Sequence, residues 1–284
     1  MKIGIDIGAT SVRVAKIKEK KVIDIEIFDT NKEDWKETLG KIDKYIEREQ
    51  KNETLELIGL CCPGPADIKE GKILITPNLP DWQDLEIKKY FEDKYNVEVL
   101  FNNDANVAGL GQALIRNKTS LLYFTVSTGI GAGLVINNQI HNGFSYTACE
   151  VANANPTLTG EDQQRTGIEY LASGINIPRV LKTRGVDVKD AREAFELLIE
   201  GKNQIVIDYF KEVEDRLVQL FSTAIYFINP EMIVIGGSVA ENNKWFFEKI
   251  FKRVHEVTID IHYKTPFEFA QDITNATLLG SVHK

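Results

Sequence analysis

The sequence contains few of the residues that build disulfide frameworks and metal centres. Its 284 residues include three cysteines and four histidines, and the histidines are scattered along the chain. Two of the cysteines are adjacent, as Cys61 and Cys62, so we expect no disulfide framework. We therefore expect a reducing, cytoplasmic compartment. The histidines show no spacing typical of metal ligands.

Long apolar runs and an excess of basic residues are also missing. No window approaches the roughly 18 apolar residues of a membrane-spanning helix. Asp6 interrupts the first apolar stretch too early for a signal peptide. Acidic residues (42) outnumber lysine and arginine (34), and the formal net charge is -8. Nucleic acids and anionic membranes attract basic faces, so we expect neither as a partner.

The sequence does contain two successive sets of strand and helix patterns. Residues 1–30 alternate apolar with polar side chains, as strands do, and helical and extended segments then alternate. The pattern restarts at "SLLYFTV" (120–126). Such alternation favours sheets covered by helices. We predict an α/β protein of two similar domains, residues 1–118 and 119–271, with a C-terminal helix at about 272–284 that packs back on the first.

Three glycine-containing turns follow apolar strands and suit phosphate binding. They are "DIGATS" (6–11), "STGIGAG" (127–133) and "IGGSV" (235–239). Without a large Cβ, backbone N–H groups can approach phosphate oxygens closely. Asp6 could hold Mg²⁺ through water. A plain hairpin turn is the alternative for the first two taken alone, but three such turns in two repeated halves favour phosphate binding.

The segment "EVLFNNDANVAGLGQA" (98–113) passes from a strand to a helix through two amides and a carboxylate. At the start of a helix, the positive end of the helix favours the ionised carboxylate of Asp104. The simpler interpretation is that Asn103 or Asp104 caps the helix. For Asn103 the two roles are compatible.

Six segments, in order over nearly the whole chain, resemble those of the ROK family of sugar kinases in the actin/Hsp70/hexokinase superfamily. They are "DIGATSVR", "CPGPAD", "TPNLPDWQDL", "FNNDANVAGLGQA", "STGIGAGLVINNQIHNG" and "INPEMIVIGGSV". The resemblance implies two actin-like (ribonuclease H-like) α/β domains flanking a central cleft. It also implies transfer of the terminal phosphoryl group of ATP, with Mg²⁺, to a hydroxyl of a hexose, and commonly a homodimer.

The same resemblance implies roles for individual residues. Asp104 is the general base in a reaction that depends on positioning and charge neutralisation. The residues implied to bind the sugar are Gly64, Asn78, Asn103, Asp104, Glu150, Asn153 and Glu169. Those implied to bind the nucleotide and its phosphates are Asp6, Gly8, Ala9, Thr10, Ser11, Thr128, Gly129, Gly131, Gly236 and Gly237.

The sequence departs from the family's pattern at the zinc site. Most members have a histidine three residues after the first sugar-binding glutamate, and three cysteines before the second. Here the histidine position is Asn153, and no cysteine follows Cys149. Tetrahedral zinc needs about four soft or imidazole ligands, so we predict no structural zinc. Cys149 replaces a glycine usual before Glu150, and we expect it to pack rather than to react.

Three alternatives to an ATP-dependent hexose kinase stay open. Some polyphosphate-using glucokinases of the family also lack the zinc cluster, although an acidic chain favours ATP over a polyanion. A sugar-responsive repressor would need a DNA-binding segment ahead of the first phosphate strand, which starts at Met1, so we do not expect one. A non-catalytic sugar-binding homologue fits the altered zinc loop, but not the retained Asp6 and Asp104.

Overall fold

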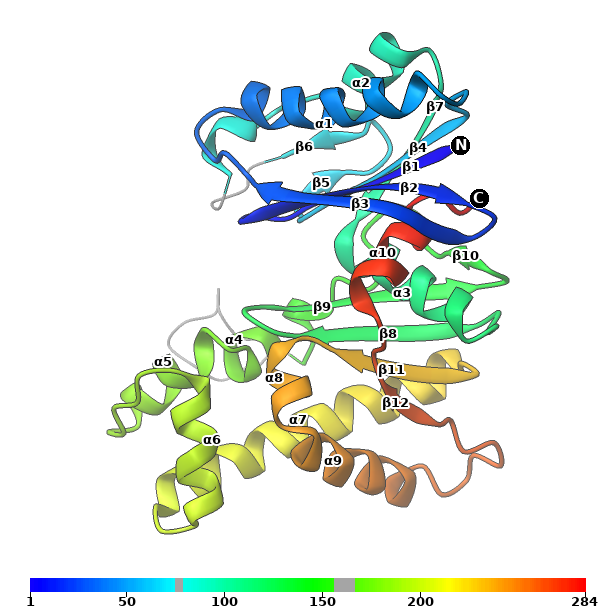
Figure 1. The fold of residues 1–284 in the computed structure, drawn as a ribbon. Helices are drawn as coiled ribbons and strands as arrows, with labels where there is room; N and C mark the ends of the chain where they lie inside the picture. Colours follow the sequence, from blue (N-terminus) through cyan, green and yellow to red (C-terminus); the bar gives the residue numbers. More distant parts are fainter. Residues whose placement is uncertain (75–78, 156–166) are drawn as a thin grey trace. The chain divides into compact units, whose positions relative to one another are not determined.

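The computed structural model describes residues 1–74, 79–155 and 167–284, and in these residues strands form two five-stranded sheets and one two-stranded sheet (Figure 1). Contacts within the chain divide it into two units. The first unit comprises Met1–Thr119, Gly133–Ala148 and Gln271–Lys284, and the second comprises Ser120–Ala132 and Cys149–Ala270. The predicted domain boundaries, 1–118 and 119–271, stay predictions. The two units differ from them mainly because residues 133–148 belong to the first unit.

The first sheet has the strand order β3-β2-β1-β4-β7. Its strands are β1 (Lys2–Ile7), β2 (Ser11–Lys18), β3 (Lys21–Asp29), β4 (Leu57–Cys62) and β7 (Glu98–Asn103). Strands β1, β2 and β3 form an antiparallel meander, whereas β4 pairs parallel with both β1 and β7. Every residue of β4 is buried, as expected for a central strand covered on both faces.

Helices cover both faces of this sheet (Figure 1). The helices are α1 (Trp35–Gln50) and α2 (Ile87–Tyr95) on one face, and α3 (Asp104–Ile115) and α10 (Ile273–Ser281) on the other. Helices α3 and α10 cross closely because glycines line the crossing: a Cβ on Gly111 would lie 1.9 Å from the Ala276 carbonyl oxygen. The first unit also contains β5 (Ala66–Asp67), β6 (Lys72–Ile73) and a 3₁₀ helix (Pro80–Trp82).

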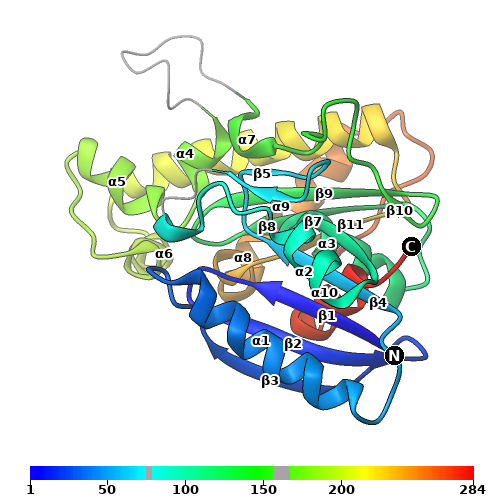
Figure 2. The same cartoon turned by 90° about the horizontal axis from the view of Figure 1, so that it is seen from above.

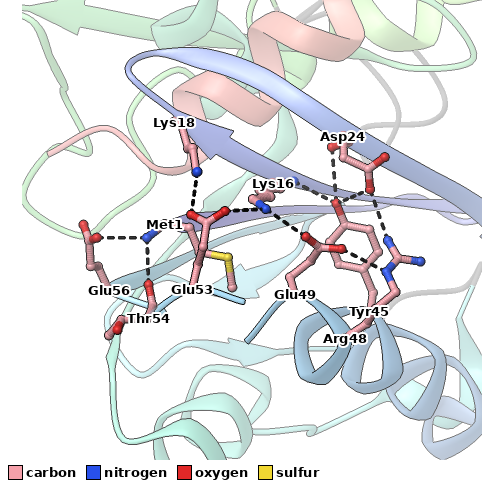
Figure 3. Close-up of polar contacts among 10 residues, drawn as sticks. All are labelled: Met1, Lys16, Lys18, Asp24, Tyr45, Arg48, Glu49, Glu53, Thr54 and Glu56. Carbon is pink, nitrogen blue, oxygen red and sulfur yellow. Dashed lines mark hydrogen bonds and ion pairs between the residues drawn. The ribbon is translucent and has the colours of Figure 1, made fainter. Parts of the chain in front are cut away.

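Polar contacts attach α1 to the meander (Figure 3). Lys16 of β2 pairs through its ammonium with Glu49, at 3.0 Å, and with Glu53, at 2.6 Å. The buried Tyr45 hydroxyl accepts from the Lys16 N–H and donates to the Asp24 carboxylate, both at 2.9 Å. Figure 2 shows α1 running alongside β1, β2 and β3. These contacts fix α1 on the face opposite α10.

The second sheet has the strand order β10-β9-β8-β11-β12. Its strands are β8 (Leu121–Val126), β9 (Ile130–Ile136), β10 (Gln139–Ile140), β11 (Met232–Gly236) and β12 (Phe267–Phe269). Strand β11 pairs parallel with β8 and β12, and β9 pairs antiparallel with β10. Each large sheet therefore combines an antiparallel part with parallel strands, and the predicted α/β fold is confirmed.

The helices of the second unit include the longest helix of the described residues, α7. They are α4 (Ile168–Ala172), α5 (Asn176–Thr183), α6 (Ala191–Glu200), α7 (Gln204–Ile228), α8 (Ser238–Asn242) and α9 (Lys244–Val257), with a 3₁₀ helix at Val151–Asn153. Asn203 caps α7 by accepting from the N–H groups of Ile205 and Val206. Aromatic packing joins α6, α7 and α9, since Phe195 contacts Phe210 and Phe246. None of the helices in the described residues is long and apolar enough to cross a membrane.

Candidate functional site

The turn between β1 and β2 is tight and braced. The Gly8 N–H donates to the Ser11 carbonyl at 2.9 Å, which closes the turn. The Thr30 hydroxyl donates to the Gly8 carbonyl at 2.7 Å, and the Thr30 N–H donates to the Thr10 carbonyl at 3.1 Å. Ala9 is half-buried and Thr10 is exposed. The turn therefore presents its small residues to solvent on a fixed backbone, as a phosphate turn requires.

Asp6 is buried at the end of β1 and is already paired. Its Oδ2 accepts from Arg13 Nη1 at 2.9 Å, and its Oδ1 accepts from the Cys61 thiol at 3.5 Å. Burial, together with the charges of Asp6 and Asp104, raises the pKa of the Cys61 thiol well above its usual value. The thiol therefore stays protonated and acts as a donor. The sequence analysis did not foresee the pair with Arg13, because partners on adjacent strands depend on register.

The Asn-Asn-Asp segment crosses from β7 into α3. Asn103 ends β7 and caps α3, since its Oδ1 accepts from the Asn106 N–H at 2.8 Å. The capping interpretation is thus confirmed for Asn103. Asp104 is the first residue of α3, is exposed, and accepts from the Ala105 N–H at 2.8 Å. The positive end of this helix stabilises its ionised form.

The strand register brings these residues to one edge of the first sheet. In the parallel pairs, Asp6 lies opposite Cys61, Cys61 lies opposite Asn102, and Cys62 lies opposite Asn103. The predicted phosphate turn follows β1 directly, and Asp104 follows β7 directly. The carboxyl ends of parallel strands are where ligands commonly bind in α/β sheets. The first unit therefore gathers its predicted residues at the customary ligand-binding edge.

A network of buried amides holds the end of β7. The Asn102 Oδ1 accepts from Asn106 Nδ2 and from the Asn103 N–H, both at 2.9 Å, and its Nδ2 donates to Asn142 Oδ1 at 2.8 Å. Asn106 is 1% exposed, and its own Oδ1 has no partner. The sequence analysis missed Asn106 and Asn142. The only signal was the density of asparagines, which does not reveal which of them meet.

The other predicted sugar contacts of the first unit are less defined. Gly64 is exposed, precedes a cis bond to Pro65, and has open space where a Cβ would stand. Its glycine is therefore not required by packing. Asn78 lies outside the described residues.

In the second unit, the turn between β8 and β9 is held by Glu169. The Ser127 N–H donates to the Gly129 carbonyl at 2.9 Å. The Glu169 Oε2 accepts from the Ile130 N–H at 2.8 Å, and a Cβ on Gly129 would lie only 2.7 Å from that oxygen. Glycine at this position therefore lets the carboxylate reach the turn. We had assigned Glu169 to the sugar alone, so its contact with the predicted phosphate turn is new.

Glu150 and Asn153 lie on the neighbouring loop. Partial desolvation and the negative charge of Glu169 raise the pKa of Glu150. Both Glu150 and Asn153 are exposed. The start of α4 packs on this loop: the Ile168 N–H donates to the Ala154 carbonyl at 2.8 Å, and a Cβ on Gly167 would lie 2.5 Å from the Asn153 Cα. Backbone packing thus joins the two glutamate-bearing segments.

Cys149 occupies a backbone conformation that favours glycine. Its φ is 66°, in the left-handed region, which is unfavourable for a residue with a Cβ. Burial, with the neighbouring charge of Glu150, raises the pKa of its thiol to about 11. The thiol is therefore protonated at neutral pH, as expected of a residue that packs rather than reacts.

No group of three or more histidine, cysteine, aspartate or glutamate side chains that could hold a metal ion occurs in residues 1–74, 79–155 and 167–284. The cysteine positions of the family's zinc site fall in the stretch before Glu169, of which residues 156–166 lie outside the described part. The absence of structural zinc therefore stays a prediction.

The end of β11 borders a cavity of about 580 Å³ in the second unit. Gly236 ends the strand, and Gly237 follows with φ 91°, where a Cβ would lie 2.5 Å from the Val126 carbonyl oxygen. The cavity is lined by Ser127, Thr128, Gly174, Ile175, Asp190, Ala191, Arg192, Phe195, Glu196, Ile199, Ser238, Val239, Asn242 and Asn243. Of these, Ser127 and Thr128 lie in one predicted phosphate turn, and Ser238 and Val239 lie in another. The contribution of α6 carries no motif and was missed.

The structure thus gathers the predicted residues into two groups, one in each unit. The first-unit group is Asp6, Gly8, Ala9, Thr10, Ser11, Asn103 and Asp104. The second-unit group is Thr128, Gly129, Gly131, Glu150, Asn153, Glu169, Gly236 and Gly237. Each group places backbone turns of phosphate size beside carboxylate or amide side chains that can bind hydroxyls.

Comparisons with known proteins identify the fold and the family that the chain resembles. A ROK hexokinase from Thermus thermophilus has the same fold, with a TM-score of 0.87 and 25% identity over 99% of this chain and 96% of that one. A glucokinase from Thermotoga maritima is 25% identical over 277 residues, 89% of this chain and 86% of the enzyme. A xylose repressor from Bacillus spizizenii is 28% identical over 205 residues, and the match spans 69% of this chain but about half (52%) of the repressor.

The predicted actin-like fold is therefore confirmed by its match to a ROK kinase structure. The sequence profile described as "ROK family" matches residues 2–283. The ordered motifs, the two mixed sheets and this match agree: the chain belongs to the ROK family.

Proposed function

We propose that this protein is a sugar kinase that transfers the terminal phosphoryl group of ATP to a hydroxyl of a hexose. One observation carries the proposal. Asp104 is an exposed carboxylate at the N-terminus of α3, on the same sheet edge as the phosphate turn that follows β1. A repressor or sugar-binding relative has no need of a proton acceptor beside a phosphate turn.

In this proposal Asp104 accepts the proton of the attacking hydroxyl. The N-terminus of α3 and the Ala105 N–H hold the carboxylate ionised. Asn103 keeps its Oδ1 on the helix cap, so its Nδ2 is the group that donates to a sugar hydroxyl. Phosphoryl transfer asks little covalent chemistry of the protein, and one oriented base with fixed neighbours meets that need.

The nucleotide would use both phosphate turns. In the first unit, the backbone of Gly8, Ala9 and Thr10 would approach phosphate oxygens, and Asp6 would hold Mg²⁺ through water. Because Arg13 binds Asp6 Oδ2, the ion would share this carboxylate with the guanidinium. In the second unit, Thr128, Gly129 and Gly131 would meet phosphate, and the cavity beside Gly237 would take the adenosine.

The sugar would be bound by carboxylates of the second unit as well. Glu150 and Glu169 can each accept two hydroxyl donors. Because Glu169 also holds the Ile130 N–H of the phosphate turn, we propose that it links sugar position to phosphate position. Gly64, Asn78 and Asn153 complete the proposed sugar set. We further propose a cytoplasmic homodimer without structural zinc, nucleic-acid partner or membrane partner.

The matched xylose repressor keeps a second function in view, a sugar-responsive regulator. One experiment separates the functions. The purified protein is assayed for phosphoryl transfer to glucose, fructose, mannose and N-acylated hexosamines, with ATP·Mg²⁺ and separately with polyphosphate. Saturable turnover of one hexose with ATP·Mg²⁺ is expected. Turnover with polyphosphate alone would correct the donor, and sugar binding without any turnover would overturn the kinase proposal.

A further inference from the structure

A second cavity of the second unit, about 730 Å³ in volume, lies where α6, α7 and α9 meet. It is lined by Leu198, Ile199, Ile207, Phe210, Lys211, Glu214, Trp245, Phe246, Lys249 and Arg253. None of the residues that the sequence analysis assigned to sugar, phosphate or nucleotide lines it. Cavities of about 300–1,000 Å³ with mostly apolar walls are the usual size of small-molecule sites.

The walls of this cavity are apolar and partly exposed. Six of the lining side chains are aliphatic or aromatic, and two of them are unusually accessible: Ile199 is 67% exposed and Trp245 is 43% exposed. Exposed apolar surface is unfavourable relative to buried apolar surface. An apolar occupant would therefore be stabilised here.

The rim of the cavity carries positioned cations. Glu214 is 3% exposed, and its two oxygens accept from Lys249 Nζ at 2.7 Å and from Arg253 Nη1 at 2.6 Å. A buried carboxylate needs such partners, and it fixes where both cations stand. The Lys249 side chain remains 60% exposed, so its ammonium can still meet another anion. With Lys211, the lining has three cations and one anion.

We propose that this pocket binds a small carboxylate amphiphile of the medium-chain fatty acid type. The apolar body would lie between Ile207, Phe210 and Trp245, and the carboxylate would pair with the Lys249 ammonium. An apolar wall with a cationic rim matches an anionic head on an apolar body, and it disfavours a neutral or cationic amphiphile. The volume suits a small molecule rather than a helix of a partner.

Occupation of this pocket should affect the cavity on the other side of α6. Ile199 lines both cavities. Phe195 of α6 lines the cavity beside β11, and its ring lies 4.5 Å from that of Phe210 and 5.5 Å from that of Phe246, which both line the 730 Å³ pocket. A ligand that shifts α6 must change both sites, and the effect must be reciprocal. This regulatory part rests on the proposed nucleotide site.

Calorimetric titration with decanoate, below its micelle concentration, tests the site. Ile207→Asn should weaken binding about tenfold, because it removes apolar contact and places an amide in the wall. Ile205→Asn is the matched control, since Ile205 lies on the same helix, is 42% exposed and does not line the cavity; it should bind as wild type does. No saturable binding, or equal loss in both variants, would overturn the proposal.

The head group is tested with a second pair. Lys249→Gln leaves Glu214 paired with Arg253, and should weaken decanoate about fivefold while leaving neutral decanol unchanged. Lys252→Gln, on the same helix but outside the lining, should change neither. If Lys249→Gln leaves decanoate binding intact, the carboxylate assignment is wrong. If Ile207→Asn instead abolishes a concentration-dependent dimer, the pocket belongs to a second copy and the proposal falls.

Coupling is measured as the affinity for a non-hydrolysable ATP analogue with and without saturating decanoate. A change of about fivefold or more, lost in Ile207→Asn, is expected for typical coupling. Unchanged affinity would overturn the coupling. If the ATP analogue bound neither with nor without decanoate, the proposed kinase function would be contradicted. The decanoate titrations test the pocket independently of that function.

Discussion

The two groups of candidate site residues are built on different kinds of backbone. In the first unit, Asp6 is the residue before the last of β1 and Asn103 ends β7, and sheet register decides their place. In the second unit, Glu150 and Asn153 lie on a loop that turns through left-handed residues, with φ 66° at Cys149 and 56° at Asn155. Strand ends are positioned by the whole sheet, whereas the loop is positioned by a few contacts. The first group should therefore be rigid and costly to disturb, and the second adjustable.

Breaking the amide network should have the largest effect on stability. Asn102→Ala leaves Asn106 Nδ2, Asn142 Oδ1 and the Asn103 N–H without their partner. Unsatisfied buried polar groups cost about 1–3 kcal/mol each, so we expect a loss of at least about 2 kcal/mol, with turnover falling as well. Denaturant unfolding measures the change. Exposed Asn52→Ala serves as the control, and equal stability of the two variants would refute the importance of the network.

Removing the Glu169 carboxylate should weaken the binding of both the hexose and ATP by the second group. Glu169→Ala deletes the acceptor of the Ile130 N–H as well as a proposed sugar contact. Hydrogen bonds to charged groups contribute about 1.5–3 kcal/mol, so kcat/KM should fall roughly 10- to 100-fold, with higher KM for both hexose and ATP. Glu169→Gln keeps an acceptor and should spare the KM for ATP. If Glu169→Ala changed the KM for the hexose but not the KM for ATP, the contact of Glu169 with the phosphate turn would be unimportant.

Relieving the strained loop residue should stabilise the protein. Cys149→Gly removes the Cβ from a left-handed backbone, a strain of about 1–2 kcal/mol that is partly offset by the greater flexibility of glycine in the unfolded chain. A net gain of about 0.5–1 kcal/mol is expected from chemical denaturation. Cys149→Ala keeps the Cβ and should show no gain. A destabilised glycine variant would mean that the thiol packs favourably enough to outweigh the strain.

The smallest expected effect is a pH dependence at Glu150. Its pKa is raised by desolvation and by Glu169, so the folded state favours the protonated carboxyl. Stability from this group is present below its unfolded pKa and is lost as pH rises through the folded pKa. Glu150→Gln should therefore raise the melting temperature at neutral pH, by less than about 3 °C, and not in acid. Glu248→Gln, at an exposed position, is the control. If Glu150→Gln raised the melting temperature equally at neutral and at acid pH, the raised pKa of Glu150 would be contradicted.

The contrast between strand ends and positions fixed by a few tertiary contacts also explains which features of the site could be predicted from the sequence. Apolar alternation and the glycine turns place Asp6, Asp104 and Gly237 at strand ends, because strand period and turn chemistry are local properties. The partners of those residues are not local. Arg13 meets Asp6 across a strand pair, and Asn142 meets Asn102 from a segment 40 residues away. Spacing alone does not reveal such contacts.

The rest of the candidate site depends on tertiary packing, which the sequence pattern does not reveal. The wall that α6 gives to the cavity beside β11, with Arg192 and Phe195, has an ordinary amphipathic pattern. The contact of Glu169 with the Ile130 N–H depends on the space left by Gly129. The family resemblance implied one role for Glu169, which is to bind the sugar. The structure shows a second contact, with the Ile130 N–H, that forms only because distant parts of the chain pack together.

The most direct test of the central claim is a comparison of binding and turnover in Asp104→Asn. The amide keeps the size of the side chain but accepts no proton, so kcat should fall by about 10²–10⁴, while calorimetry should show hexose binding within a modest factor of wild type. Asp93→Asn, an exposed position on α2, should leave both quantities unchanged. If Asp104→Asn retains wild-type kcat, Asp104 is not the general base, and the account of the first unit as the catalytic edge is contradicted.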